Sequence, residues 1–228
     1  MDAGGPALRQ DAERNRDRVL AAAREAYAAE GIGASMASIA RRAGVGIATV
    51  FRRFPTREAL VEAVFADRMT AYAQAVELAL ADPDPWAGFA GYVETVCGMQ
   101  AADRGFGEVL TLTFPTARAL EERRDAAYHG LVALLDRAKA AGRLRTDVVP
   151  EDMVVLLMAN AGVVAATGDA APDAWRRHVA HQLRGFAVDG GEVPAPPAPT
   201  PSSMYRAMLR AAPTTSGRAR RTGPAPSR

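Results

Sequence analysis

The chain has one cysteine and almost no lysine. The single Cys97 excludes an intramolecular disulfide framework and a zinc site built from several cysteines. It lies on an apolar helical face, which favours a buried structural thiol over a redox sensor. Lys139 is the only lysine, so arginine supplies nearly all of the positive charge. A GC-rich coding bias can produce the same composition, and the arginine count alone therefore indicates no function.

Long apolar runs are also missing. No run of 18 apolar residues is apparent, and the N-terminus is polar and charged where a signal peptide would be apolar. These absences predict a soluble, cytoplasmic protein with no membrane partner. Aromatic residues are few and β-branched runs are short, whereas alanine and leucine dominate. The composition predicts an all-α fold, and 228 residues suffice for a sizeable core in one or two domains.

Acidic residues are absent from residues 35–57, which contain Arg41, Arg42, Arg52, Arg53 and Arg57. Two short helix-compatible stretches in this segment meet across a turn at residues 43–46, the organisation of a helix-turn-helix. Its positive charge would attract a nucleic acid, because neutralising phosphates releases counterions. A basic helical hairpin that only packs is the alternative, but the order of small, apolar and basic residues favours DNA.

Helical periodicity and capping residues predict about nine helices. The predicted helices cover 11–30, 35–43, 46–54 and 56–81, a fifth helix that begins at Pro85 and is marked by apolar residues from Trp86 to Cys97, a short helix after Gly105, and 114–141, 150–166 and 172–187. Gly31, Gly44 and Gly142 would end three of them. The 150–166 helix is apolar almost all round and must be covered on more than one side.

The segment ASIARRAGVGIATVFRRFPTREALV, residues 37–61, resembles the DNA-binding domain of the TetR family of bacterial transcriptional regulators, and the resemblance extends over residues 18–65. Residues 143–153 and 156–162 also resemble a C-terminal domain common in actinobacterial members. The resemblance implies an N-terminal three-helix domain followed by a helical bundle. We therefore expect a mobile arm (1–10), a helix-turn-helix domain (11–57), a ligand-binding and dimerisation domain (58–190) and a tail (191–228).

The tail is rich in proline and arginine. Eight prolines fall between residues 194 and 226, and six arginines but no acidic residue follow Glu192. Such a segment cannot bury enough apolar surface to offset its ordering entropy, so we expect it to be disordered. A solvated tail is the simplest interpretation, and weak contact with phosphates is the alternative.

The resemblance implies a set of DNA-binding residues. They are Met36, Ala37, Ile47, Ala48, Thr49, Phe51, Arg52, Arg53, Thr56 and Arg57. Residues 47–49 would face base edges, where Thr49 can bind a phosphate or place its methyl group against thymine. Phe51 stands where the family usually has a phosphate-binding tyrosine, so that hydrogen bond is missing or replaced by apolar packing. Arg52 and Arg53 can compensate electrostatically, and Arg57 lies at a positive helix N-terminus.

The family also implies an effector pocket among the middle helices and a dimer through the last two. The pocket candidates are Tyr72, Trp86, Phe89, Tyr92, Met99, Phe106, Leu110 and Phe114. Each could be core, but together they indicate an apolar or aromatic small molecule. The dimer candidates are Leu156, Ala159, Gly162, Val163, Trp175, Val179 and Leu183. Small residues allow close helix crossing in a four-helix bundle, unless one chain covers these surfaces itself.

No motif supports an enzyme. A nucleophile elbow and a phosphate loop are absent, and residues 121–124 (EERR) indicate a solvated, self-paired helix face. His178 and His181 share a helix face without a third metal ligand, which favours surface or interface positions. We expect no catalytic residue, metal or cofactor.

The sequence thus predicts a homodimeric repressor of a palindromic operator. Two recognition helices would enter major-groove half-sites roughly 34–36 Å apart, and an effector that binds one state better would release the DNA. A DNA-binding dimer without an effector is the alternative.

Overall fold

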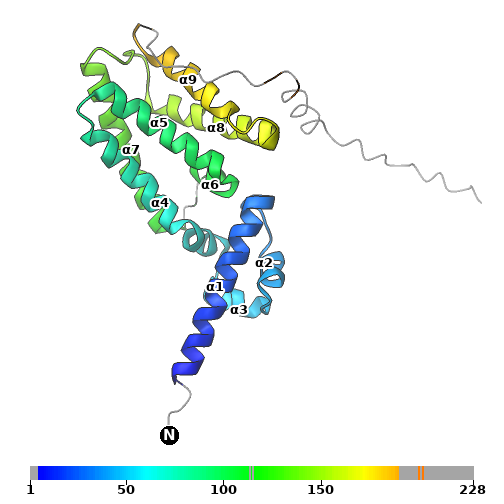
Figure 1. Ribbon diagram of the computed structural model, residues 1–228. Coiled ribbons are helices and arrows are strands. Elements are labelled where there is room, and N and C mark those ends of the chain that lie inside the picture. The colour runs from blue at the N-terminus through cyan, green and yellow to red at the C-terminus, as the bar shows by residue number, and fades with distance from the viewer. Residues whose placement is uncertain (1–4, 113, 115, 190–199, 201, 203–228) are drawn as a thin grey trace, which may run out of the picture.

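A computed structural model describes residues 5–112, 114, 116–189, 200 and 202, with side chains from residue 10 onward (Figure 1). This part of the chain contains nine α-helices and one short 3₁₀ helix. They are α1 (Gly5–Glu30), α2 (Met36–Ala43), α3 (Ile47–Arg53), α4 (Arg57–Ala81), α5 (Pro85–Ala102), α6 (Arg104–Thr111), α7 (Arg118–Ala140), α8 (Pro150–Thr167), η1 (Gly168–Ala170) and α9 (Ala174–Phe186). The all-α prediction is confirmed.

The start of α1 corrects the predicted arm. The helix begins at Gly5 rather than near Asp11, so residues 5–10 are helical where an arm was predicted, while residues 1–4 lie outside the described part. Pro6 is tolerated in the first turn, because its missing N–H has no partner there, and residues 7–10 are good helix formers. The first turns of α1 extend beyond α2 and α3 (Figure 1).

Residues 31–54 fold as the capping pattern predicts. The Ser35 hydroxyl accepts a hydrogen bond from the Ser38 amide at 3.1 Å and starts α2. Gly44 ends α2 at φ 64°, a conformation that a residue without Cβ adopts without strain. Ile39 and Val50 are fully buried and hold α2 and α3 against the core. This short turn fixes the orientation of α3.

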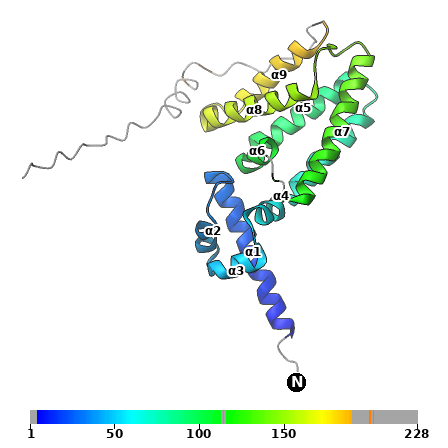
Figure 2. The ribbon, with the colours of Figure 1, turned by 180° about the vertical axis from the view of Figure 1, so that it is seen from behind.

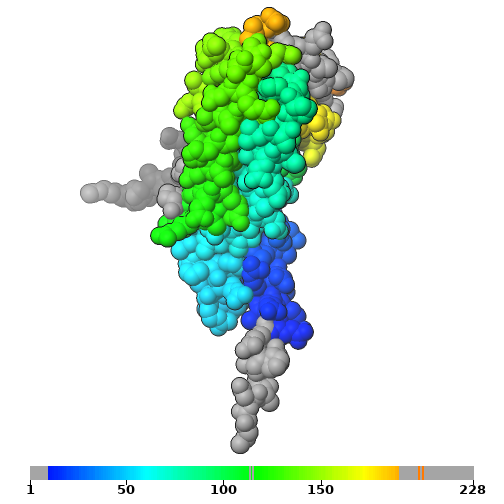
Figure 3. Space-filling view, turned by 90° about the vertical axis from the view of Figure 1, so that its left-hand side faces the viewer, coloured from blue at the N-terminus to red at the C-terminus, as the bar shows by residue number. Residues whose placement is uncertain are grey.

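The remaining helices form an upper bundle (Figures 2 and 3). α4 leaves the small N-terminal domain and packs along α7 and α5. The Asp84 carboxylate accepts from the Trp86 amide at 2.8 Å and caps α5, with Pro85 at its first position as predicted. α7 starts at Arg118 rather than near Phe114, because Phe114 belongs to the preceding loop and donates its amide to Glu121 at 2.8 Å.

α8 is covered on one face only. Met153, Leu156, Asn160 and Thr167 are buried, whereas Val155 on the opposite face is 64% exposed. Within the described residues, α8 is the one helix whose length and composition would suit a membrane span, although Glu151, Asp152 and Asn160 interrupt its apolar residues. Among the described residues, nothing covers this face, so the second cover predicted for the helix is not found within residues 5–189.

The predicted tail, residues 191–228, lies outside the described part except for residues 200 and 202.

Candidate nucleic-acid interface and candidate ligand cavity

α3 presents its side chains away from the core. Ile47 is 42% exposed and Phe51 46% exposed, and Ala48, Arg52 and Arg53 are exposed as well. Thr49 is half-buried at the edge of this surface. The exposed side of α3 is therefore apolar near its start and positively charged at its end.

α1 adds to this surface. A groove of about 250 Å³ is lined by Asn15 and Arg16 of α1 and by Thr49, Arg52 and Arg53 of α3, among others. Sequence reasoning missed Arg16, because its place beside α3 depends on how the two helices pack. The arginines along one face of α1 were the sequence feature that could have indicated it. Three arginines beside one groove can bind a phosphate backbone.

Two predictions about this surface need correction. The side chain of Met36 is buried in the hydrophobic core, so its predicted approach to DNA is wrong, whereas Ala37 is exposed. The side chain of the first residue of a short amphipathic helix can point inward and pack against the core. Arg42 forms an ion pair with Glu30 of α1, so the charge of residues 35–57 is partly neutralised from outside that segment.

The start of α4 lies at the edge of the same domain. The Thr56 hydroxyl accepts a hydrogen bond from the Ala59 amide at 3.1 Å, and Thr56 and Arg57 are exposed. The helix N-terminus and the Arg57 guanidinium together favour an anion at this point.

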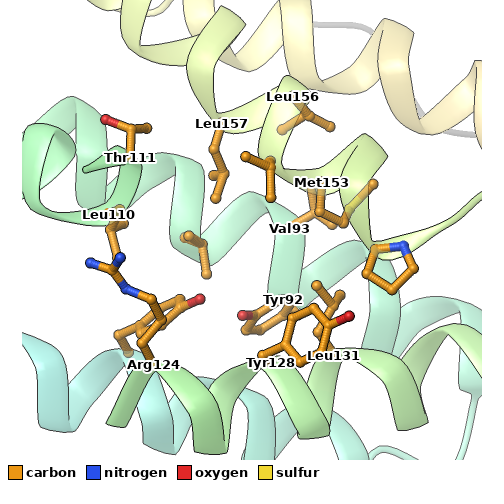
Figure 4. Close-up of a pocket in the computed structure, with 14 residues that line it drawn as sticks. Tyr92, Val93, Leu110, Thr111, Arg124, Tyr128, Leu131, Met153, Leu156 and Leu157 are labelled. Atoms are coloured by element: carbon orange, nitrogen blue, oxygen red, sulfur yellow. The ribbon is translucent and has the colours of Figure 1, made fainter. Parts of the chain in front are cut away.

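A second site lies in the upper bundle. A cavity of about 130 Å³ opens between α4, α5, α6, α7 and α8 (Figure 4). It is lined by Tyr72, Tyr92, Val93, Val96, Leu110, Thr111, Arg124, Tyr128, Leu131, Pro150, Met153, Val154, Leu156 and Leu157. Most of these side chains are apolar, and the polar ones come from four different helices.

The cavity includes three of the eight pocket candidates, Tyr72, Tyr92 and Leu110. The others lie elsewhere. Trp86 and Phe89 pack together in the core with ring centroids 5.8 Å apart, and Phe106 packs against Phe65 at 6.0 Å. Phe114 is buried outside the cavity, and Met99 lines a separate groove between α4 and α5. Their periodicity marked these residues as apolar, but core and cavity walls share that pattern.

Arg124 is the main polar residue that sequence reasoning missed. Residues 121–124 were expected to be solvated, but the Arg124 side chain is only 21% exposed. Its Nη2 donates to the Val109 carbonyl at 2.7 Å, and its Nη1 lies 3.8 Å from Glu121 Oε2. The predicted pairing within residues 121–124 is thus found between Glu121 and Arg124. The prediction that these two side chains are exposed to solvent is wrong.

Two phenols share the cavity with Arg124. Burial raises the pKa of Tyr72, although the nearby Tyr92 hydroxyl and Arg124 lower it in part. Burial also raises the pKa of Tyr92 well above its ordinary value. Both phenols therefore stay protonated at neutral pH and can donate hydrogen bonds.

α6 connects the cavity with the small N-terminal domain. Leu110 and Thr111 line the cavity, and Glu108 on the same helix accepts a hydrogen bond from the Ile32 amide at 2.9 Å. Arg104 contacts both sides, with Nε 3.3 Å from Glu108 Oε1 and Nη1 donating to the Ala29 carbonyl at 3.3 Å. Gly31 makes this approach possible, because a Cβ there would lie 2.4 Å from Glu108 Oε1.

A buried polar contact seats α8 on α5. Asn160 donates to the Cys97 carbonyl at 3.2 Å and to Gln100 Oε1 at 2.9 Å. Cys97 itself is buried, and burial raises the pKa of its thiol to about 12, which agrees with the predicted structural thiol. In the part of the chain that is described, no group of three His, Cys, Asp or Glu residues could hold a metal ion.

The dimer candidates divide into two groups. Leu156 and the α9 stripe of Trp175, Val179 and Leu183 are buried inside the protomer, so the prediction that they form a surface for a partner is wrong. The α9 stripe faces α5 and α8, and the Trp175 ring lies 3.3 Å from where a Cβ of Gly98 would be. Ala159 and Gly162 are exposed and Val163 is half-buried.

Residues 19–64 match the family described as "Bacterial regulatory proteins, tetR family", and residues 84–190 match "Transcriptional regulator SbtR-like, C-terminal domain". A TetR transcription regulatory protein from Mycobacterium vanbaalenii is 35% identical, with 79% of this chain and 99% of that chain covered and a TM-score of 0.45. A TetR transcriptional regulator from Streptomyces coelicolor is 30% identical, with coverage of 75% and 98% and a TM-score of 0.47.

A more distant structure, that of RolR in complex with resorcinol, is 21% identical with a TM-score of 0.52, and covers 82% of this chain and 98% of its own. It shares the fold. The comparison with curated proteins gives no match.

The exposed helix-turn-helix and the helical bundle define a DNA-binding transcriptional regulator. The chain belongs to the TetR family, as its identity to the mycobacterial regulator over nearly all of that protein shows, and this family is not enzymatic.

Proposed function

We propose that the protein is a cytoplasmic homodimeric repressor that binds a palindromic operator and is released by a small apolar or aromatic effector. The outward exposure of Ile47 and Ala48 on a helix-turn-helix, with the half-buried Thr49 beside them, carries the DNA-binding part. Few of the exposed residues on α3 read bases by hydrogen bonds, so arginine–phosphate contacts would supply most of the affinity.

The cavity and α6 support the effector response. An effector that contacts Leu110 or Thr111 acts on the helix whose Glu108 binds the turn after α1. A change in the position of α6 would therefore alter the orientation of the small domain and the spacing of the two recognition helices. The effector must bind the two spacings with different affinity, since otherwise the equilibrium does not shift. The structure of RolR in complex with resorcinol, from a distant relative, supports a small effector.

The uncovered face of α8 supports the homodimer. Val154, Val155, Met158, Ala159 and Gly162 are exposed on one helix. Large exposed apolar patches are rare on monomers and mark contact sites. Because the face continues along a helix, a second copy could place its own α8 against it.

The test begins with selection of bound fragments from random DNA by the purified full-length chain. The expected result is a two-fold symmetric motif whose half-sites are about one helical turn apart. Absence of any preferred sequence would overturn the proposal. Sedimentation of the complex with the selected duplex then reports whether two chains bind each site.

A further inference from the structure

The size of the cavity limits its occupant. At about 130 Å³ it is close to an engineered cavity of about 150 Å³ that binds benzene. A fused ring system or a long acyl chain would require the walls to move. The cavity as it stands fits one ring or a short branched chain.

The side chains that line the cavity carry a positive charge and no negative charge. Arg124 is the only charged residue among those that line the cavity, and none of them is a carboxylate. Arginine stays charged at all physiological pH values, so this charge is permanent. The other polar groups are the phenols of Tyr72, Tyr92 and Tyr128 and the Thr111 hydroxyl. An anion would meet donors here and no negative side chain.

The guanidinium retains hydrogen-bonding capacity. Nη2 donates to the Val109 carbonyl, while the buried Nε finds no acceptor among the described residues. Glu121 compensates the charge only in part, since its Oε2 lies 3.8 Å away and its Oε1 accepts from the Phe114 amide. Glu121 does not line the cavity. Because Arg124 lines the cavity, an oxygen of a ligand can accept a charge-assisted hydrogen bond from its guanidinium.

We propose that the effector is a small single-ring or short-chain anion, such as a carboxylate, whose apolar body packs between α5 and α8 and whose charged oxygen binds Arg124. Figure 4 shows the arrangement, with Arg124 at one side of the cavity and Met153, Leu156 and Leu157 of α8 across from Tyr92 and Tyr128. This inference rests on the proposed effector function and specifies the chemical class of the ligand.

Three ligands of nearly equal shape test the charge. Benzoate is anionic, benzamide neutral and benzamidine cationic at pH 7.5. Thermal denaturation of the full-length chain with each compound gives the relative affinities by mass action. We expect benzoate to bind on the order of tenfold more tightly than benzamide, the difference expected for one charge-assisted hydrogen bond. Benzamidine should not raise the melting temperature.

Substitution of Arg124 tests whether this residue causes the preference for the anion. In Arg124→Gln the preference for benzoate over benzamide should disappear, while Arg123→Gln should retain it, since Arg123 precedes Arg124 on α7 and does not line the cavity. If Arg124→Gln fails to fold, Arg124→Lys keeps the charge, and the comparison of the three ligands in the unaltered chain still decides.

The outcomes separate this inference from the proposed function. If benzamide and benzoate bind equally and both release the duplex, the effector function stands and the anion inference is overturned. If none of the three compounds shifts the melting temperature while DNA binding is intact, the inference is also overturned, and the DNA-binding role remains.

Discussion

Thr49 lies at the boundary between the buried and exposed sides of α3, next to Arg52 and Arg53 in the groove shared with α1. It is the one uncharged polar residue of α3, whose other side chains outside the core are those of Ile47, Ala48, Phe51, Arg52 and Arg53. At the scale of single residues, we therefore expect specificity and affinity to depend on different side chains.

Thr49→Ala should weaken binding to the selected operator by about 1 kcal/mol, the usual net value of one hydrogen bond. Binding to unrelated duplexes should hardly change, because a phosphate-dominated affinity does not depend on this residue. Fluorescence anisotropy with both duplexes measures the difference. Equal losses on operator and unrelated DNA would show that Thr49 does not read sequence.

Arg52→Ala and Arg53→Ala should each weaken binding to all duplexes and reduce the slope of log K against log salt by about 0.9 for each phosphate that is no longer neutralised. Arg143→Ala is the matched control, since Arg143 is exposed in the loop between α7 and α8. Titrations at several salt concentrations give the slopes. An unchanged slope would show that the substituted arginine does not bind a phosphate.

At the scale of elements, α6 links the cavity to the small N-terminal domain in addition to α4, and only the structure shows its contact with the turn after α1. Glu108→Ala should leave the buried amide of Ile32 without an acceptor, which costs about 1–3 kcal/mol of stability. The variant should also lose part of its effector response, because α6 no longer holds the turn at Gly31. Thermal denaturation and DNA release by effector measure the two effects.

Two further variants separate the loss of the hydrogen bond to the Ile32 amide from the loss of the carboxylate charge. Glu108→Gln keeps an oxygen for the Ile32 amide but loses the ion pair with Arg104, so it should be closer to the unaltered chain in stability. Glu122→Ala, at an exposed position on α7, is the control for loss of a carboxylate. A normal response to effector in Glu108→Ala would assign the coupling to another contact.

The ends of the helices agree with the prediction where a capping side chain is present and differ from it elsewhere. Ser35, Thr56 and Asp84 cap α2, α4 and α5 as predicted, because these hydrogen bonds lie within a few residues of each other. The start of α1 at Gly5 and of α7 at Arg118 had no comparable signal. For α7, a contact of the Glu121 carboxylate with the preceding loop decides the boundary.

At the scale of the whole molecule, the exposed apolar face of α8 is the surface that the proposed homodimer would use. Met158→Glu places a charge on this face and should shift the protein from dimer to monomer, with a large loss of operator affinity, because two half-sites no longer bind as one unit. Analytical ultracentrifugation measures the mass. Leu78→Glu, at a position 74% exposed on α4, is the control and should stay dimeric. A monomeric unaltered chain, or a dimeric Met158→Glu, would contradict the assignment of this face.

The sequence by itself determined the all-α class, the helix-turn-helix and the outward orientation of α3. These depend on periodicity, caps and a four-residue turn, which are local in the chain. Only the tertiary structure decided which apolar residues line a cavity together with Arg124. It also decided that the α9 stripe faces inward, while one face of α8 is exposed among the described residues. Helices distant in sequence meet there, and an apolar face looks the same in sequence whether a core, a ligand or a second chain covers it.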